Sequence, residues 1–175
     1  MAPPPSQITV YTDGSCFRNG SEDTRCGAGV WLADNHSLNR AIRVPGQTQS
    51  NQIGELAEVV VALQSIPRNA DLMIVTDSQY VIKCLTNCLS RWEDSGWPRV
   101  PNAHWIKAAA YVLRRRAAPT RFKWIKGHDG DRGNERADAL AAEGVGKPIP
   151  DDVDISVPVR TSRHEVKQTD TSICL

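Results

Sequence analysis

Two apolar, β-rich stretches of this chain each end on the dipeptide Thr-Asp. Ile8-Thr9-Val10-Tyr11 leads into Thr12-Asp13, and Leu72-Met73-Ile74-Val75 leads into Thr76-Asp77. A helical pattern lies between them, so we expect neighbouring parallel strands joined by a helical crossover. The carboxyl ends of parallel strands meet at one edge of a sheet, where ligand sites form in α/β folds. The repeated dipeptide therefore predicts an α/β fold in which Asp13 and Asp77 lie side by side.

The remaining segments predict how the sheet is completed. Three β-type runs separated by Gly, Asn and Asp clusters indicate an antiparallel meander before the crossover. The expected element order is βββαβααβα, which describes a mixed five-stranded sheet, a three-strand antiparallel meander plus parallel strands, flanked by helices. The expected strands are 7–12, 28–33, 38–44, 71–76 and 120–125, and the expected helices are 54–65, 78–89, 103–116 and 132–143.

The length of 175 residues fits one globular domain. We expect a disordered N-terminus at 1–6, a catalytic domain at 7–146 and a polar tail at 147–175, because the sequence from about Gly144 is rich in polar residues and Pro and has no periodicity. No run of about 18 apolar residues occurs, so no membrane span is expected.

The formal net charge is +1, from 21 Lys and Arg against 20 Asp and Glu, which excludes a strongly basic nucleic-acid binder. Positive charge is concentrated locally: residues 111–136 hold eight basic and three acidic side chains. This excess favours a polyanionic partner, and the alternative is a solvated face.

The five cysteines are odd in number and form no C-x-x-C pair, and the N-terminal MAPPPSQ has no apolar segment. These features predict a reduced intracellular protein, in the nucleus or cytoplasm and not secreted. Cys84 and Cys88 lie four residues apart in an expected helix. Structural thiols are favoured over a zinc site, because no second ligand pair accompanies them.

Helix geometry orients three further carboxylates. At about 100° per residue, Glu55 falls about 90° from the centre of the apolar face of helix 54–65, and Glu58 about 150° from it. Glu55 is thus expected beside the core and Glu58 in solvent. Asp138 lies beside the inner face of the last helix. Asp13, Glu55, Asp77 and Asp138 together would suit Mg²⁺ or Mn²⁺, and two such ions support phosphodiester hydrolysis. The alternative for each Thr-Asp is a turn or a helix cap.

His128 lies in a loop with three glycines, ten residues before Asp138. An imidazole on a mobile loop is suited to proton transfer near neutral pH. A solvated loop histidine is the alternative.

Four segments together resemble ribonuclease H of type 1, over about Gln7 to Gly144: TDGSCFRNG at 12–20, GELAEVVVAL at 54–63, TDSQYV at 76–81 and KGHDGDRGNERADALA at 126–141. The resemblance implies the RNase H-like fold. It also implies a metal-dependent endonuclease that cuts the RNA strand of an RNA–DNA hybrid, by a two-metal-ion mechanism, to 3′-hydroxyl and 5′-phosphate products.

Roles for particular residues follow from the same resemblance. The four carboxylates match metal ligands for two Mg²⁺ ions, with Mn²⁺ as an alternative, and His128 matches a histidine that assists proton transfer or product release. The protein is expected to act as a monomer on its hybrid. The residues expected to contact the hybrid are Asn19, Asn51, Gln79, Trp92, Trp97 and Asn134. Ordinary loop polarity is the alternative for Asn19, Asn51 and Gln79, and a small satellite core for the two tryptophans.

The sequence departs from the family pattern in its basic regions. Many members carry a long projection rich in Lys and Trp, whereas segment 89–99 here is short and has Glu93 and Asp94, so we expect weaker hybrid affinity. No separate N-terminal hybrid-binding module is expected. The basic residues Arg114, Arg115, Arg116, Arg121 and Lys123 either compensate in part for this missing positive charge or, for the three consecutive arginines, form a solvated helix end.

Two further functions stay open. One is another enzyme of this fold, such as a resolvase or the ribonuclease H domain of a retroelement polyprotein. The other is a hybrid-binding module that no longer cleaves.

Overall fold

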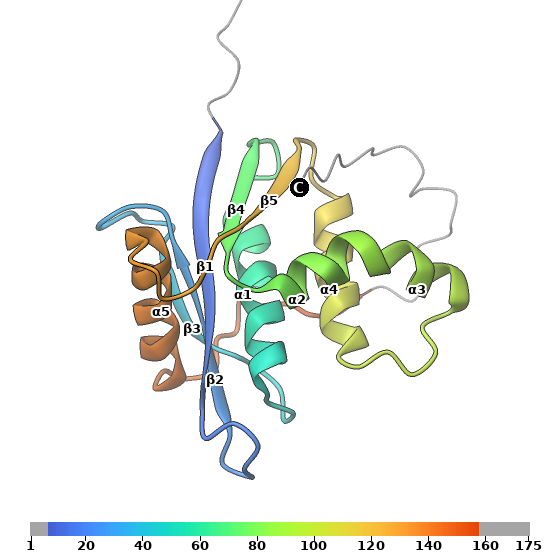
Figure 1. The fold of residues 1–175 in the computed structure, drawn as a ribbon, viewed down its shortest axis with the longest axis horizontal. Helices are drawn as coiled ribbons and strands as arrows, with labels where there is room; N and C mark the ends of the chain where they lie inside the picture. Colours follow the sequence, from blue (N-terminus) through green and yellow to red (C-terminus); the bar gives the residue numbers. More distant parts are fainter. Residues whose placement is uncertain (1–6, 158–175) are drawn as a thin grey trace, which may run out of the picture.

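The computed structural model describes residues 7–157, which form one mixed sheet of five strands flanked by helices (Figure 1). The strand order is β3-β2-β1-β4-β5. β1 pairs antiparallel with β2, as does β2 with β3, whereas β1–β4 and β4–β5 are parallel. The predicted meander, crossover and element order are confirmed. The elements are β1 Ile8–Phe17, β2 Arg25–Trp31, β3 Arg40–Arg43, α1 Asn51–Ser65, β4 Leu72–Thr76, α2 Gln79–Lys83, η1 Cys84–Cys88, α3 Leu89–Ser95, α4 Ala103–Arg114, β5 Thr120–Trp124 and α5 Arg132–Val145.

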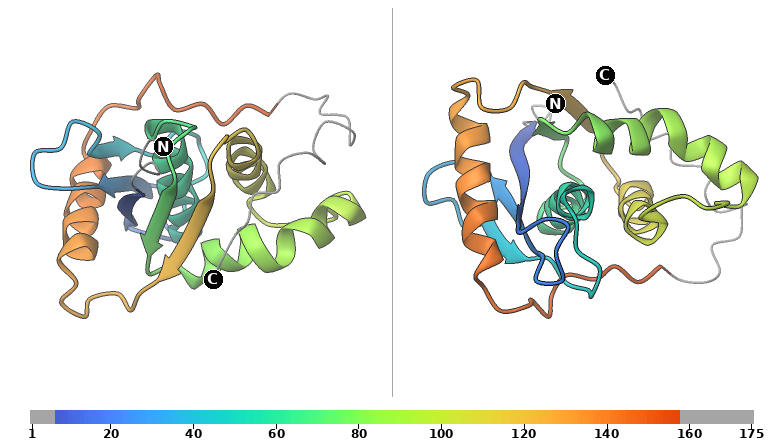
Figure 2. Two further views of the ribbon diagram at one scale, coloured as in Figure 1. Left: turned by 90° about the horizontal axis from the view of Figure 1, so that it is seen from above. Right: turned by 60° about the horizontal axis from the view of Figure 1, so that its bottom comes forward.

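The helices cover the two faces of the sheet unequally. α5 lies alone on one face, against β1, β2 and β3, whereas α1 lies on the other face with α4 packed outside it (Figures 1 and 2). The hydrophobic core fills the space between the sheet, α1 and α4, and includes Ile53, Leu56, Ile74, Trp105 and Phe122. α1 is therefore enclosed from both sides.

Because α1 is enclosed, the prediction that Glu58 lies in solvent is wrong. Glu58 was expected in solvent because it lies far from the apolar face of its helix, yet its side chain is 0% exposed. The prediction assumed that α1 buries only one face. In the structure every residue from Ile53 to Leu63 is buried except Glu55. A helix sandwiched between a sheet and another helix has no solvent face in its middle turns.

β1 is longer than its apolar run indicated. It continues through Thr12 and Asp13 to Phe17, because this part pairs with β2 after the pairing with β4 has ended at Tyr11. The predicted end of the strand near residue 12 was wrong. Asp13 thus lies within a strand, held by backbone pairing to Gly29.

The helix expected at 78–89 is part of a longer helical run from Gln79 to Ser95 that reaches away from the sheet (Figure 2). Its middle turn, Cys84–Cys88, is a π-helix. The run ends at Gly96, whose left-handed backbone (φ 76°) is the conformation that glycine adopts most easily. Ser78 caps its beginning by accepting a hydrogen bond from the Val81 N–H at 3.1 Å.

The cysteines differ from the expectation of five reduced thiols. Cys16 of β1 and Cys26 of β2 are directly opposite in the antiparallel register and are joined by a disulfide. Cys84 and Cys88 are buried free thiols, as predicted, and Cys174 lies outside the described residues. Sequence spacing did not indicate the pair because strand register, not a short motif, brings the two residues together.

Residues 147–157 follow α5 without helix or strand and lie against the domain. Val153, Ile155 and Val157 pack on the core, and Arg40 Nη2 forms an ion pair with Asp152 at 2.8 Å. The expected disordered N-terminus at 1–6 and the rest of the expected tail, 158–175, lie outside the described residues. Within 7–157 no helix is long and apolar enough to cross a membrane.

Candidate active site

The parallel register of β1 and β4 brings Asp13 and Asp77 to matching positions. Tyr11 pairs with Val75 at the end of the ladder, and each aspartate lies two residues further along. Side chains two residues apart in extended chains point to the same side. The two aspartates are close enough to interact electrostatically.

A close contact between the backbones of β1 and α1 brings Glu55 near the aspartates. A Cβ on Gly14 would lie 2.5 Å from the carbonyl carbon of Gly54 and 2.7 Å from the nitrogen of Glu55. Real Cβ atoms do not approach backbone so closely, so only glycine at position 14 allows α1 to rest on β1 there. Glu55 Oε2 accepts a hydrogen bond from the Ser78 hydroxyl at 2.8 Å, which ties it to the residue after Asp77.

Asp138 arrives from the opposite face of the sheet. Gly29, the partner of Asp13 in β2, has no side chain, and a Cβ there would overlap the carbonyl oxygen of Ala137 in α5. Gly27 meets Ala141 in the same way. This close approach sets α5 against the sheet, so that Asp138 interacts electrostatically with Asp13.

The electrostatics of the site centre on Asp13, whose side chain is 7% exposed. Burial raises its pKa to about 7, with further contributions from Asp77, Asp138 and Glu55, while the hydrogen bond from the Gly14 N–H opposes the shift. Burial also raises the pKa of Glu55, against the hydrogen bond from Ser78. Four carboxylates, from β1, α1, α5 and the residue that follows β4, thus share one region of negative charge.

The chemistry of this donor set fits a hard divalent cation, because all four groups offer oxygen and their mutual repulsion is the kind that a cation relieves. No three Asp, Glu, His or Cys side chains in residues 7–157 are arranged closely enough to hold an ion as they stand. Asp77 is turned towards the loop that follows β5, where a Cβ on Gly127 would overlap its Oδ2.

His128 lies in that same loop. It is exposed and has a left-handed backbone, with φ 54°. The beginning of the loop is anchored to Asp77, since Trp124 Nε1 donates a hydrogen bond to the Asp77 carbonyl oxygen at 3.0 Å. The loop that bears His128 is therefore attached to the carboxylate cluster, while the imidazole itself faces solvent.

The residues expected to contact a hybrid occupy different surroundings. Asn19 and Asn51 are brought together: the Asn51 N–H donates to Asn19 Oδ1 at 3.1 Å. Gln79 is exposed at the start of α2. Asn134, by contrast, is 2% exposed, so its side chain lies beneath the surface.

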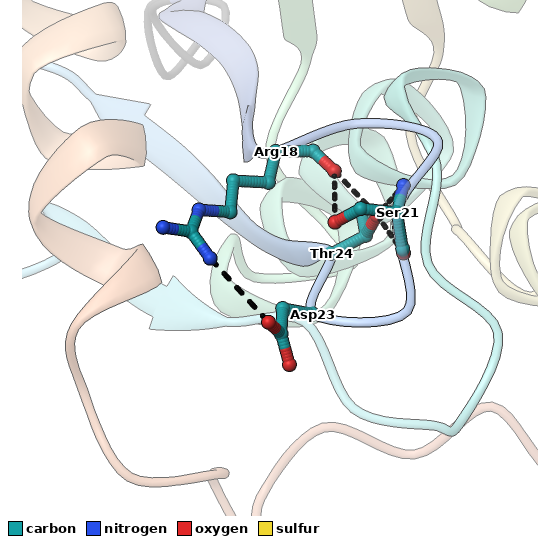
Figure 3. A network of polar contacts seen from close by, with 4 residues as sticks. All are labelled: Arg18, Ser21, Asp23 and Thr24. Carbon is teal, nitrogen blue, oxygen red and sulfur yellow. Dashed lines mark hydrogen bonds and ion pairs between the residues drawn. The ribbon is translucent and has the colours of Figure 1, made fainter.

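The β1–β2 turn that carries Asn19 is built around one carbonyl oxygen. Arg18 O accepts from the Ser21 hydroxyl at 2.9 Å and from Thr24 Oγ1 at 2.7 Å, and Arg18 also forms an ion pair with Asp23 at 3.4 Å (Figure 3). These bonds fold the turn back on itself and hold Asn19 at the N-terminus of α1.

Trp92 and Trp97 pack together, with ring centroids 6.1 Å apart, and both are half-buried against the core. Lys107 Nζ lies 5.0 Å from the centroid of the Trp97 ring. They form a small aromatic cluster between α3 and α4.

The arginines of the basic segment have structural partners. Arg116 is 3% exposed and donates to the carbonyl oxygens of Ile66, Pro67 and Ala70. Arg114 pairs with Glu93, and Arg121 pairs with Asp71 at 2.6 Å. The expected solvated helix end is thus wrong for Arg116, because its guanidinium joins the end of α4 to the segment after α1.

Glu58, which was expected in solvent, is a buried hydrogen-bond acceptor, and this role was not predicted from the sequence. Glu58 Oε1 accepts hydrogen bonds from Thr12 Oγ1 at 2.8 Å and Thr76 Oγ1 at 2.7 Å, all three side chains being 0% exposed. Burial raises the pKa of Glu58 well above its usual range, as does the charge of Asp13. The available signal was the repeated threonine before each aspartate, which offers two hydroxyls facing the helix.

Comparison with known proteins agrees with this architecture. The family model described as RNase H matches residues 5–146. Human ribonuclease H1 is 37% identical over 143 residues, which are 79% of this chain and 50% of that protein, so the chain spans about half the length of such relatives. Ribonuclease H of Bordetella avium is 36% identical over 149 residues, 82% of this chain and 93% of that protein.

Solved structures show the same fold. LC9-RNase H1, described as a type 1 RNase H with the type 2 active-site motif, superposes with a TM-score of 0.63 at 24% identity, covering 83% of this chain and 75% of that one. The PFV RNase H domain gives a TM-score of 0.60 at 24% identity, covering 78% and 93%. Because the family model matches most of the chain and relatives are 36–37% identical to it, and because the sheet has the same arrangement, the chain belongs to the RNase H family.

Proposed function

We propose that this protein is a metal-dependent endonuclease that hydrolyses the RNA strand of RNA–DNA hybrids, leaving 3′-hydroxyl and 5′-phosphate ends. The observation that carries the proposal is the convergence of Asp13 of β1, Glu55 of α1, Asp77 just after β4 and Asp138 of α5, near enough for the other three charges to act on Asp13. Membership of the RNase H family supports the same activity.

In this proposal the four carboxylates hold two Mg²⁺ ions, or Mn²⁺ in their place. When bound, the ions supply a Lewis acid for the scissile phosphate and activation of the attacking water. The carboxylates set the positions of both ions. The close backbone contacts at Gly14 and Gly29 and the hydrogen bond from Ser78 set where the carboxylates lie. The Asp77 carboxylate, which lies beside Gly127, joins the other three in holding the ions.

The exposed His128 donates a proton to the leaving 3′-oxygen, which becomes the 3′-hydroxyl, or assists product release. Asn19, Asn51 and Gln79 lie along the neighbouring surface, where amide groups can recognise the 2′-hydroxyls that separate RNA from DNA. Trp92 and Trp97 offer an apolar surface further along the hybrid. Asn134, whose side chain is buried at the start of α5, is left out of the proposed hybrid contacts.

The decisive experiment compares four labelled substrates: an RNA–DNA hybrid, an RNA duplex, a DNA duplex and single-stranded RNA. Each is incubated with the wild-type protein, Asp77→Asn and the control Asp151→Asn, whose side chain is exposed on the segment after α5. Mg²⁺, Mn²⁺ and EDTA are compared. We expect metal-dependent cleavage of the RNA strand of the hybrid by the wild type and Asp151→Asn, and none by Asp77→Asn.

Two results would contradict the proposal. A hybrid that is bound but stays intact with either metal would identify a hybrid-binding module that does not cleave. Equal cleavage of single-stranded RNA would identify a different nuclease.

A further inference from the structure

A fully buried glutamate lies directly beneath the carboxylate cluster and has no role in the mechanism above. Glu58 is in the middle of α1, one turn after Glu55, and is surrounded by apolar residues of the same helix such as Val59 and Val61. Burying a carboxyl group is costly unless its oxygens are hydrogen-bonded. An apolar residue would pack at this position without that cost, so folding alone does not explain a glutamate here.

The contacts of Glu58 indicate what it does. A single oxygen, Oε1, accepts from Thr12 Oγ1 at 2.8 Å and from Thr76 Oγ1 at 2.7 Å. These threonines belong to β1 and β4, which pair with each other only as far as Tyr11 and Val75. Glu58 thus bridges the two strands at the first position beyond their backbone ladder.

The next residue of each strand is an expected metal ligand, Asp13 after Thr12 and Asp77 after Thr76. The bridge therefore controls the separation of the two backbone segments from which these aspartates project. The network also reaches a third ligand. Thr76 Oγ1 accepts from the Ser78 N–H at 3.0 Å, and the Ser78 hydroxyl donates to Glu55 Oε2 at 2.8 Å.

We propose that Glu58 is a positioning residue, which joins β1, β4 and α1 beneath the site and sets the spacing of Asp13, Glu55 and Asp77 for cation binding. This inference rests on the proposed function. Buried networks of this kind restrict the groups they connect to one arrangement. Its second oxygen, Oε2, is buried without a hydrogen-bond partner among the described protein groups, which leaves the group held through Oε1 alone.

The test uses two substitutions at position 58. Glu58→Gln keeps the oxygen that accepts both hydroxyls, whereas Glu58→Leu keeps the approximate volume and removes the acceptor. The matched control is Leu63→Ala, a buried position more than one turn further along the same helix, whose apolar side chain cannot join the hydrogen-bond network. For each protein we would measure the Tm in EDTA, the Mn²⁺ concentration that gives half of the maximal Tm increase, and kcat and KM for a hybrid.

Glu58→Leu is expected to raise the half-saturating Mn²⁺ concentration and to lower kcat, each by about 10-fold to 100-fold, as changes to groups that orient metal ligands do. KM for the hybrid should not change. Glu58→Gln should restore both quantities to within about twofold of the wild type, because the acceptor oxygen is what positions the strands. Leu63→Ala should lower the Tm alone.

Two outcomes would overturn the inference. In the first, Glu58→Leu keeps the wild-type Mn²⁺ dependence and kcat, which makes Glu58 a core residue only. In the second, Glu58→Gln fails as severely as Glu58→Leu, so that the proton or charge matters and the acceptor does not. A wild type that neither binds Mn²⁺ nor cuts a hybrid would instead overturn the proposed function itself.

If Glu58→Leu does not fold, Thr12 provides the same test. Thr12→Val removes one hydroxyl donor at nearly constant shape, and Thr12→Ser keeps it. The inference requires weaker Mn²⁺ binding in Thr12→Val and near wild-type binding in Thr12→Ser. Equal Mn²⁺ binding by the two variants would contradict it.

Discussion

Gly14 and Gly54 meet backbone to backbone, with only 2.5 Å between the carbonyl carbon of Gly54 and the position that a Cβ on Gly14 would take. Each glycine is bonded to an expected metal ligand, Gly14 to Asp13 and Gly54 to Glu55. The contact therefore sets how far apart a strand carboxylate and a helix carboxylate can lie.

Gly14→Ala should separate β1 from α1. Overpacking of this kind costs about 1–3 kcal/mol of unfolding free energy, and we expect a loss of cleavage larger than this loss of stability would produce. Urea unfolding and hybrid cleavage measure the two effects. The control is Gly146→Ala, because a Cβ there meets nothing closer than 3.7 Å and the backbone has an ordinary φ of −87°. Full activity of Gly14→Ala would show that the contact has no part in the site.

Gly127→Ala tests the attachment of the His128 loop to the carboxylates. A Cβ on Gly127 would overlap Oδ2 of Asp77, so either the loop or the carboxylate has to move. We expect a reduced kcat and a changed Mn²⁺ dependence with a Tm close to that of the wild type, because the loop contributes little to the core. Unchanged kinetics would indicate that the loop yields and Asp77 stays in place.

The contribution of Asp13 to the stability of the metal-free protein should fall as the pH rises. The pKa of Asp13 is raised from 3.8 to about 7, so between these values the folded protein keeps a proton that the unfolded chain has lost. The stabilisation is complete below pH 3.8 and is lost as the pH passes about 7, amounting to about 4 kcal/mol.

Thermal unfolding of wild type and Asp13→Asn in EDTA, from about pH 4 to pH 8, measures this contribution. The Tm of Asp13→Asn relative to wild type should increase with pH, because asparagine cannot ionise. The Tm increase caused by Mn²⁺ should also grow with pH in the wild type. Parallel pH profiles for the two proteins would be inconsistent with the raised pKa.

His128→Ala should lower kcat by on the order of 100-fold, as loss of a proton-transfer group does. KM for the hybrid and the Tm should not change, because the side chain is exposed. His104→Ala, at an exposed position at the start of α4, serves as the control. A raised KM with an unchanged kcat would assign His128 to hybrid binding.

Arg116→Met should cost about 3 kcal/mol of unfolding free energy, because it leaves the carbonyl oxygens of Ile66, Pro67 and Ala70 without their charged donor. Arg115→Met is the control, since Arg115 is exposed and its guanidinium carbon lies over the Tyr111 ring, 5.3 Å from the ring centroid. The salt dependence of hybrid binding should be unchanged in Arg116→Met, because a buried guanidinium contacts no phosphate. A reduced salt dependence would place Arg116 at the hybrid surface.

Much of the fold could be predicted from local patterns. Alternating and apolar runs indicated all five strands, and the crossover helix between the two Thr-Asp strands required them to be parallel. Prediction failed where the pairing with another strand, and not the local pattern of the residue's own segment, decides the structure. β1 extends to Phe17 because β2 continues to pair with it, and Cys16 meets Cys26 through the register of that pairing.

The same division applies to the site. The sequence alone determined that the two Thr-Asp pairs come at the ends of the apolar runs of two parallel strands. It also predicted that Glu55 and Asp138 border the inner faces of their helices, since these relations depend on periodicity and strand direction. Only the tertiary structure decided that Glu58 is buried between Thr12 and Thr76, and that Arg116 is buried at the end of α4. The physical reason is that periodicity describes one face of one helix, whereas burial depends on every element packed around it, and α1 is enclosed by the sheet on one side and α4 on the other.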